Sequence, residues 1–402
     1  MRFCSDSTYA VTLAAACAFF SSACGRSTGS PALPSATPSS HPPAPAPSAA
    51  PPASAAVVDL GAHTFEHYCQ LCHAKDATGY AADNAPSLVS QTYLESASDD
   101  MIAAGIRMGR PGTAMAAYGR ERGGPLEERE ITALVGFLRS KGPANHALPP
   151  APADGDARRG SEVFEKNCQT CHGTTTTRAT AVSLYNRELL AAASPAFLRF
   201  AVVNGRPPTP MPSFQGKLSD QEISDVVAWL WSFKPALPAP AVEHLTIPDN
   251  LPVVINPKGS RPKFTLREDR FVPAEQVKKA LEAKQRLVII DARAASDWIQ
   301  FHIPGAISGP YHDPKVLDRI PKDGTWVVAY CACPHHASGE VVDELRRRKY
   351  PNTAVMDEGI LFWKDHGFPL LGEAIPHSNA LAESPLTHPA APKSTQKSPP
   401  KP

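Results

Sequence analysis

Two copies of the pattern Cys-x-x-Cys-His constrain this chain more than any other feature of its sequence. The first copy covers residues 69–73, and the second covers 168–172, 99 positions later. Each copy is preceded at the same spacing by a glycine and a phenylalanine, Gly61 and Phe65 in the first and Gly160 and Phe164 in the second. A repeat of this kind predicts two similar domains, each with its own cysteine pair and histidine.

The residue types in this pattern match the covalent attachment of haem. The two thiols add to the vinyl groups of the porphyrin, and the adjacent histidine supplies a nitrogen ligand to iron. A zinc site is disfavoured because the cysteine pairs lie in separate repeats, and a thiol redox pair does not explain the histidines. The sequence therefore predicts two covalently bound c-type haems, held by Cys69 and Cys72 with His73 and by Cys168 and Cys171 with His172.

The repeat continues after the cysteines. A Gly-Arg-Pro segment leads to Met115 in the first copy and to Met211 in the second, again at identical spacing. Apolar residues at helical spacing then predict a closing amphipathic helix in each copy, over 126–138 and 218–230. In both copies we expect the side of the first helix that carries the glycine and phenylalanine to pack against the haem.

Together these features resemble the class I cytochrome c family. The shared features are a first helix ending in the cysteine motif, a methionine on a proline-rich loop, and a closing helix that crosses the first. The resemblance covers 58–142 and 155–236, and it implies that Met115 and Met211 are the sixth ligands to two irons. In the second copy exclusion supports this, because His172 and Met211 are the only histidine and methionine between residues 150 and 240.

The sixth ligand of the first site has more candidates. Four other side chains with suitable atoms lie in the same region, namely His63, His67, Met101 and Met108. We favour Met115 because only its position matches the second copy. One departure from the family is Ala74, which follows the first motif where glycine is usual. Histidine and methionine fill both axial positions of iron, so they favour electron transfer over a di-haem peroxidase.

The N-terminus has the pattern of an export signal. Arg2 precedes an apolar stretch at 10–20, which is shorter than the roughly 20 residues of a membrane span. Residues 21–25 resemble a bacterial lipoprotein cleavage site, at which Cys24 is the lipidated residue, although Ser21 stands where leucine is usual. Ordinary secretion is the alternative. We expect a location in the periplasm or on the outer surface of a bacterial membrane, with a lipid anchor.

After a proline-rich connector the pattern changes to short apolar strands that alternate with helices. Strands are expected at 287–291, 326–331 and 353–356, and helices at 273–283 and 338–349. Alternation of this kind predicts an α/β fold with a parallel sheet. Four segments in this order resemble a rhodanese domain over 265–375, namely Asp291-Ala292-Arg293, His302-Ile303-Pro304-Gly305-Ala306, Tyr330-Cys331 and 358–363.

The resemblance places Cys331 where rhodaneses carry the cysteine that takes up sulfur as a persulfide. The loop that follows contains Cys333, His335 and His336 but no arginine or lysine, so a classical thiosulfate sulfurtransferase is in doubt. Cys333 is a candidate resolving thiol, and His335 or His336 a candidate base or cation. A soft-metal site in the loop and a catalytically silent docking domain are the alternatives.

The sequence thus predicts two all-α cytochrome c domains followed by one α/β rhodanese-like domain. The expected ranges are a signal peptide at 1–24, a tether at 25–57, cytochrome c domains at 58–142 and 155–236 with a linker at 143–154, a connector at 237–264, the rhodanese-like domain at 265–375 and a tail at 376–402. One hypothesis is an electron carrier whose rhodanese-like domain handles a reduced sulfur compound and feeds electrons to the haems. The other is a pure electron carrier with a silent or redox-sensing rhodanese-like domain.

The expected partners follow from these two hypotheses. A respiratory donor and acceptor are needed in both, a small sulfur compound in the first, and a membrane surface is contacted through Cys24. The formal net charge of +1, with no basic patch interleaved with aromatic residues, argues against nucleic acid.

Overall fold

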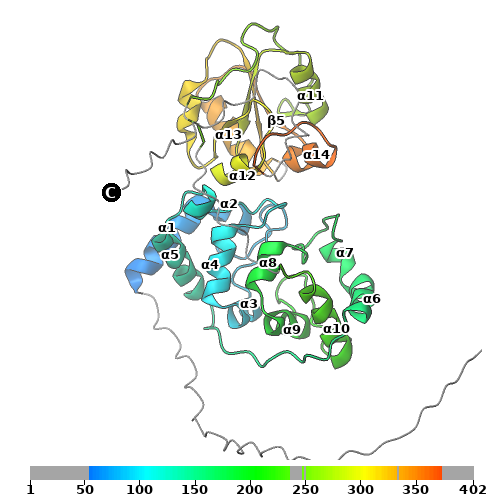
Figure 1. Cartoon of the computed structure of the whole chain (residues 1–402). Helices are drawn as coiled ribbons and strands as arrows, with labels where there is room; N and C mark the ends of the chain where they lie inside the picture. Colours follow the sequence, from blue (N-terminus) through cyan, green and yellow to red (C-terminus); the bar gives the residue numbers. More distant parts are fainter. Residues whose placement is uncertain (1–53, 236–246, 249, 333–334, 374–402) are drawn as a thin grey trace, which may run out of the picture. The chain divides into compact units, whose positions relative to one another are not determined.

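In the computed structural model of this chain, residues 54–235, 247–248, 250–332 and 335–373 are described. The predicted signal peptide with Cys24, most of the tether, part of the connector, the whole C-terminal tail and Cys333 lie outside these ranges. Figure 1 shows the labelled helices and strands along the chain.

The first helical segment consists of five α-helices and one 3-10 helix. They are α1 (Ala55–Tyr68), α2 (Gln70–His73), α3 (Gln91–Ser96), α4 (Asp99–Met108), η1 (Arg120–Arg122) and α5 (Glu128–Arg139). The second segment repeats the α-helices in the same order, as α6 (Ala157–Asn167), α7 (Gln169–His172), α8 (Arg187–Ala192), α9 (Pro195–Asn204) and α10 (Asp220–Trp231). The duplication read from the sequence is thus a duplication of structure.

The closing helices begin two residues later than expected, and their N-terminal caps explain the shift. In α5, Glu127 and Glu130 form a capping box, in which each side chain accepts a hydrogen bond from the backbone N–H of the other. Ser219 and Glu222 form the same arrangement before α10. Because a capping box fixes the first helical residue, the apolar residues just before it, Leu126 and Leu218, lie outside the helix.

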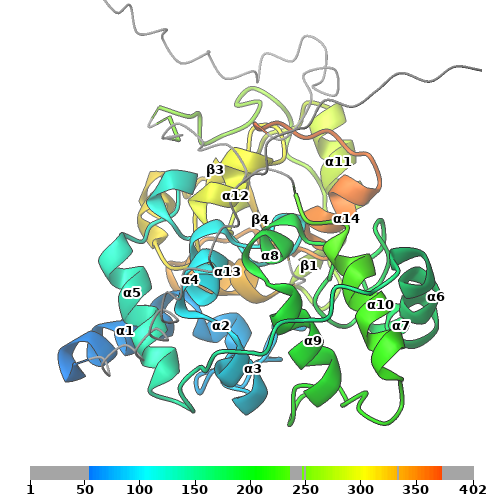
Figure 2. The same ribbon diagram turned by 60° about the horizontal axis from the view of Figure 1, so that its bottom comes forward.

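The first and last helices of each segment lie against each other (Figures 1 and 2). A glycine stands where each pair meets. A Cβ atom on Gly61 would lie 2.1 Å from the carbonyl oxygen of Ala133 in α5, and one on Gly160 would lie 2.0 Å from that of Asp225 in α10. Phe65 continues this contact, with its ring centroid 5.2 Å from that of Phe137. Glycine is needed at both crossings because two helices touch backbone to backbone there. The contact of this side of the first helix with a haem stays a prediction.

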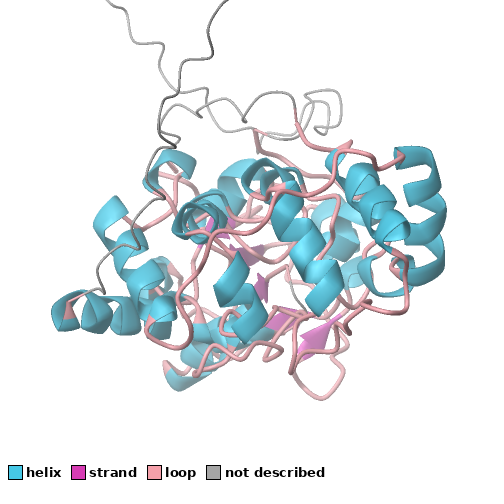
Figure 3. Cartoon of the chain, turned by 90° about the horizontal axis from the view of Figure 1, so that it is seen from below, coloured by secondary structure: helices cyan, strands magenta, loops and turns pink. Residues whose placement is uncertain are grey.

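The C-terminal domain is a three-layer α/β structure. Its five parallel strands are β1 (Phe271–Val272), β2 (Leu287–Asp291), β3 (Ile307–Ser308), β4 (Trp326–Tyr330) and β5 (Thr353–Met356), in the order β1-β5-β4-β2-β3. The other elements are α11 (Ala274–Glu282), α12 (Ala295–Gln300), η2 (Pro314–Arg319), α13 (His336–Arg347) and α14 (Gly359–Asp365). Figure 3 distinguishes these strands from the helices by colour.

Alternate residues of each strand pack on opposite faces of the sheet. Val288 and Ile290 of β2 pack in a core with apolar residues of α12, η2 and α13. Leu287 and Ile289 pack in a second core with residues of α11 and α14. Because both faces are buried, the strands are apolar throughout, which explains why three of them were recognisable in the sequence. The two others have only two residues each.

Candidate haem sites and cysteine loop

Each cysteine motif forms one short helical turn after a break in the first helix. The break falls at Cys69 between α1 and α2, and at Cys168 between α6 and α7. The N–H of each of these cysteines still donates to a phenylalanine carbonyl of the preceding helix, and the N–H of the motif histidine donates to the cysteine carbonyl. Both motifs therefore present two cysteines and a histidine from the same backbone geometry.

The two motif histidines are buried and held in the same way. His73 is 6% exposed, and its Nδ1 lies 2.9 Å from the carbonyl oxygen of Pro86. His172 is 8% exposed, and its Nδ1 lies 2.8 Å from the carbonyl oxygen of Val182. A carbonyl oxygen only accepts, so Nδ1 is the donor and Nε2 has the lone pair. Metal-binding histidines are commonly oriented in this way, and so both residues fit an axial ligand to haem iron.

Burial also favours the neutral form that iron needs. Desolvation lowers the pKa of His73 and of His172, although the hydrogen bond to the backbone carbonyl opposes the shift in each case. A neutral imidazole with its proton on Nδ1 has one free nitrogen lone pair. Each of these two histidines thus has the free imidazole nitrogen that a haem iron would need.

The two methionine loops also have the same geometry. The N–H of Arg110 donates to the carbonyl oxygen of Met115 at 2.8 Å, and that of Arg206 donates to Met211 at 3.0 Å. Within each loop a threonine hydroxyl accepts from the methionine N–H, Thr113 at 3.1 Å and Thr209 at 3.3 Å. The side chains proposed as sixth ligands therefore lie on equivalent loops.

The structure explains why each Gly-Arg-Pro segment begins with glycine. Gly109 and Gly205 end α4 and α9 with φ angles of 62° and 66°. A Cβ atom on either would lie within 2.6 Å of the backbone that follows the methionine. Glycine is needed at these positions because the loop folds back onto its own helix end.

The alternative ligands of the first site lie elsewhere in the segment. Met101 is buried in the core on α4, and Met108 is the last residue of that helix. His63 and His67 are exposed on α1. None of them lies on the loop that matches the second copy, so Met115 remains the proposed ligand.

In the α/β domain, Cys331 follows the last residue of β4 and is only 1% exposed. Its Sγ lies 3.2 Å from Oγ of Ser338, in the first turn of α13. The helix begins at His336, two residues before the expected start, so His336 belongs to the helix and His335 is its N-cap. Cys333, on which both the resolving-thiol and the soft-metal interpretations depend, lies outside the described residues.

His335 is held by residues that the sequence did not indicate. Its Nε2 lies 2.7 Å from Oδ1 of Asp357 and 2.9 Å from the carbonyl oxygen of the same residue. Arg267 donates two hydrogen bonds to the Asp357 carboxylate, at 3.0 and 2.8 Å. Phe271 lies against the His335 ring with a centroid distance of 4.1 Å. These partners come from β1, β5 and their flanking loops, so no local sequence pattern could connect them with the cysteine loop.

The Asp-Ala-Arg segment of the rhodanese resemblance is structural. Arg293 donates to both carboxylate oxygens of Asp291, at 2.9 and 2.7 Å, and both side chains are buried. The hydroxyl of Tyr330 donates to Asp291 at 2.9 Å and accepts from the N–H of Ile303 at 3.2 Å. This one network joins three of the four segments on which the resemblance rests. Within it, the Arg293 guanidinium is paired with the Asp291 carboxylate.

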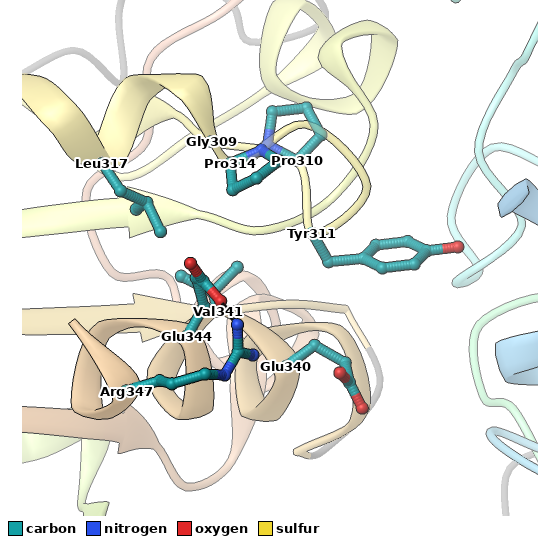
Figure 4. A pocket seen from close by; sticks show the side chains of 9 residues that line it. All are labelled: Gly309, Pro310, Tyr311, Pro314, Leu317, Glu340, Val341, Glu344 and Arg347. Atoms are coloured by element: carbon teal, nitrogen blue, oxygen red, sulfur yellow. Dashed lines mark hydrogen bonds and ion pairs between the residues drawn. The ribbon is translucent and has the colours of Figure 1, made fainter.

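A cavity of about 310 Å³ lies beside α13 (Figure 4). Glu340, Glu344 and Arg347 line it from the helix, and Leu317 and Tyr311 line it from the opposite side. Arg347 forms an ion pair with Glu344, and Cys331 is not among the lining residues. A cavity with two carboxylates and one paired arginine is a poor site for a sulfur anion.

The fold and the sites define a multidomain redox protein with a helical cytochrome c region and a C-terminal rhodanese-like domain. The family model for cytochrome c oxidase, cbb3-type, subunit III matches residues 56–138 and 155–230. The model for the rhodanese-like domain matches residues 273–366. Cytochrome c segments of this kind bind haem c covalently, and they exchange electrons with redox partner proteins.

Relatives of known role match the cytochrome region. The chain is 29% identical over 182 residues to the cbb3-type cytochrome c oxidase subunit FixP of Bradyrhizobium sp. (strain ORS 278), covering 43% of this chain and 59% of that protein. It is 28% identical over 204 residues to the dihydro-heme d1 dehydrogenase of Pseudomonas aeruginosa, covering 50% and 39%. The chain thus spans between about two fifths and three fifths of the length of these relatives.

A solved rhodanese-like domain from Anabaena is 24% identical to this chain and has a TM-score of 0.25. The match covers 29% of this chain and 89% of the Anabaena domain.

Among the described residues, no helix combines the length and apolar character that a membrane span requires.

Proposed function

We propose that this protein is an extracytoplasmic carrier with two c-type haems, and that its rhodanese-like domain oxidises a reduced sulfur compound and delivers the electrons to the haems. The observation that supports the carrier most directly is the pair of equivalent histidines, each with Nδ1 bonded to a backbone carbonyl. Two equivalent methionine loops accompany them. The duplication supports two haems, one for each cysteine motif.

The chain's own residues provide each ligand of this proposal. Cys69 and Cys72 form thioethers to the first haem, and His73 and Met115 bind its iron. Cys168 and Cys171 form thioethers to the second haem, and His172 and Met211 bind its iron. With a histidine and a methionine as its iron ligands, each haem would supply electron transfer and would leave no ligand position for oxygen or peroxide.

The sulfur step is assigned to Cys331. As a thiolate, Cys331 would accept a hydrogen bond from the Ser338 hydroxyl, and it precedes the N-terminus of α13 in the chain. Hydrosulfide is the simplest reduced sulfur compound for this site. One S–S bond forms between Sγ of Cys331 and the hydrosulfide sulfur, the hydrosulfide proton is released, and two electrons leave, one to each haem. The product is a persulfide anion on Cys331.

The proposed location rests on the N-terminal segment. The export signal and Cys24 support a periplasmic protein, or one held on the outer surface of a bacterial membrane by lipid. Intact-mass analysis of the N-terminal peptide from a bacterial host tests this: a diacylglyceryl group on Cys24 is expected, and an unmodified mature N-terminus shows ordinary secretion instead.

Haem content and sulfur-dependent reduction test the proposal in one preparation. The full chain, produced in a host that matures c-type cytochromes, is expected to contain two haems by pyridine haemochrome quantification. After oxidation, anaerobic mixing with hydrosulfide is expected to reduce both haems, and Cys331→Ser is expected to abolish this reduction. Equal reduction of the variant and the wild type contradicts the role of Cys331.

The burial of Cys331 favours a second candidate function. A thiol that is 1% exposed has little contact with solvent, as expected for a catalytically silent rhodanese-like domain that binds a partner or senses redox state. Mass spectrometry of Cys331 and Cys333 after treatment with thiosulfate, polysulfide and peroxide separates the two functions. An adduct on either thiol supports the active site, and unmodified thiols in all three treatments support the silent domain.

A further inference from the structure

His335 is restrained at its backbone, on one face of its ring and at one of its ring nitrogens. Its backbone has a φ of 79°, which is unfavourable for a residue with a Cβ atom, and it caps α13. Its ring packs on Phe271, and its Nε2 is bonded to Asp357. Backbone strain of this kind persists only where the surroundings enforce it, and it is common at functional sites.

Asp357 is itself fixed as a carboxylate. The hydrogen bonds from Arg267 are the largest cause of a lowered pKa of Asp357, so the residue is ionised at neutral pH. Arg267 also lies over the Phe271 ring, with its guanidinium carbon 4.5 Å from the ring centroid. Arginine, aspartate and histidine are thus arranged around one phenylalanine.

This arrangement determines which nitrogen of His335 bears the proton. Both partners of Nε2, the Asp357 carboxylate and the Asp357 carbonyl, can only accept hydrogen bonds. Nε2 is therefore the donor, and Nδ1 of the neutral ring has the lone pair. The side chain is 34% exposed, so a small molecule can reach the ring.

The segment that holds His335 also holds the reactive cysteine. Ile360 follows Asp357 by three residues, and its N–H donates to the carbonyl oxygen of Cys331 at 2.9 Å. A Cβ atom on Gly359 would lie 2.8 Å from the same oxygen, so the segment contacts the loop closely. The turn after β5 thus fixes the Cys331 end and the His335 end of one loop.

We propose that Nδ1 of His335 accepts the proton of the sulfur compound oxidised at Cys331, and that Asp357 and Arg267 are positioning residues for this histidine. This inference rests on the proposed function. In the step, Sγ of Cys331 and the hydrosulfide sulfur form the S–S bond, the S–H bond of hydrosulfide breaks, its proton moves to Nδ1, and two electrons leave to the haems. The Asp357 carboxylate stabilises the imidazolium that results.

Asp357→Asn in the full chain tests this proposal. The asparagine amide can donate to Nε2 of His335, which allows the imidazole proton to move from Nε2 to Nδ1. Nδ1 is then no longer an acceptor for the hydrosulfide proton. We expect haem reduction by hydrosulfide to slow by about 10- to 100-fold. This factor lies at or below the lower end of what a positioned proton acceptor commonly contributes. His335→Gln is expected to slow the reaction equally, and the double variant no further, because the two residues act as one unit.

The matched control is Asp343→Asn. Asp343 also receives two hydrogen bonds from an arginine, Arg270, at 2.6 and 3.0 Å, but it lies on α13 away from His335. Its replacement is expected to leave the rate unchanged. Alkylation of Cys331 by iodoacetamide provides a second readout, because this reagent brings no proton to remove. We expect similar alkylation rates in the wild type, Asp357→Asn and Asp343→Asn.

Each other outcome overturns a defined statement. If Asp357→Asn reacts with hydrosulfide as fast as the wild type, the inference is wrong and the proposed function stands. If the variant slows alkylation and the sulfur step alike, Asp357 only maintains the shape of the loop. If hydrosulfide neither reduces the wild-type haems nor adds sulfur to Cys331, the sulfur function and this inference are both wrong.

Discussion

The guanidinium of Arg159 donates two hydrogen bonds to the carboxylate of Asp225, at 2.7 and 2.9 Å, and so links α6 to α10 where the two helices cross. Asp225 is 2% exposed and also accepts from the backbone N–H of Asp156 at 2.7 Å. In the first helical segment the equivalent positions are Leu60 and Ala133. The same crossing is therefore polar in one copy and apolar in the other.

We predict that Asp225→Ala destabilises the second helical segment by roughly 1–3 kcal/mol, because the half-exposed Arg159 guanidinium and the N–H of Asp156 lose a buried carboxylate acceptor. Adding Arg159→Leu, which completes the residue pair of the first segment, is expected to recover part of the loss. Denaturant unfolding followed through the haem absorbance measures both effects. Equal stability of the wild type and Asp225→Ala would show that the ion pair contributes nothing.

The same pair predicts a dependence of stability on pH. The hydrogen bonds from Arg159 are the main cause that lowers the pKa of Asp225 to about 2, whereas an unfolded aspartate has a pKa of about 3.9. The contribution of this group is therefore complete above the unfolded value and is lost as the pH falls toward 2. We expect the stability difference between the wild type and Asp225→Ala to shrink over this interval, as thermal unfolding at several pH values can measure.

Ala74 is the position where the first cysteine motif departs from the second, and the structure shows the consequence. It has φ 63° and ψ 160°, a region that is almost restricted to glycine, and Gly173 has a φ of 75° in the second copy. We predict that Ala74→Gly stabilises the first segment by about 1 kcal/mol, since relief of strain exceeds the added entropy of the unfolded chain. Gly173→Ala is expected to have the opposite effect, because its Cβ would lie 2.2 Å from the carbonyl oxygen of Thr177. Thermal unfolding of the two variants checks both signs.

The sequence predicted features that depend on spacing along the chain, and it missed those that depend on contacts across it. The cysteine motifs, the duplicated helices and the strands β2, β4 and β5 follow from local patterns, and their observed bounds differ by at most one residue in the strands. β1 and β3 have two residues each, too few for a period to be visible.

The candidate sites show the same division. The motif histidines and the methionine loops could be identified because they recur at fixed spacing in two copies. Arg267 and Asp357 lie 68 and 22 residues from His335, and neither belongs to a pattern that marks a site. Their roles depend on β1 and β5 being neighbours in the sheet, which only the fold reveals.

The crossing glycines give a prediction about packing. Gly61→Ala places a methyl group 2.1 Å from the carbonyl oxygen of Ala133, so α1 and α5 must separate. We expect a loss of about 1–3 kcal/mol in the stability of the first segment. Glu66→Ala on the same helix, at an exposed side chain outside the crossing and the candidate sites, is the control and should have little effect. Similar unfolding midpoints for the two variants would contradict the close crossing.

The final prediction concerns the sixth ligand of the first haem. If Met115 and Met211 each bind one iron, Met115→Ala is expected to remove about half of the methionine-to-iron absorption band of the oxidised protein, and the Met115→Ala/Met211→Ala double variant all of it. The reduction potential of the first haem should also fall, since a methionine ligand raises it. Met101→Leu and Met108→Leu are the controls, because these methionines lie on α4 and not on the matching loop. A full band in Met115→Ala, together with a reduced band in one of the controls, would assign the ligand to that methionine and would mean that the two copies bind their haems differently.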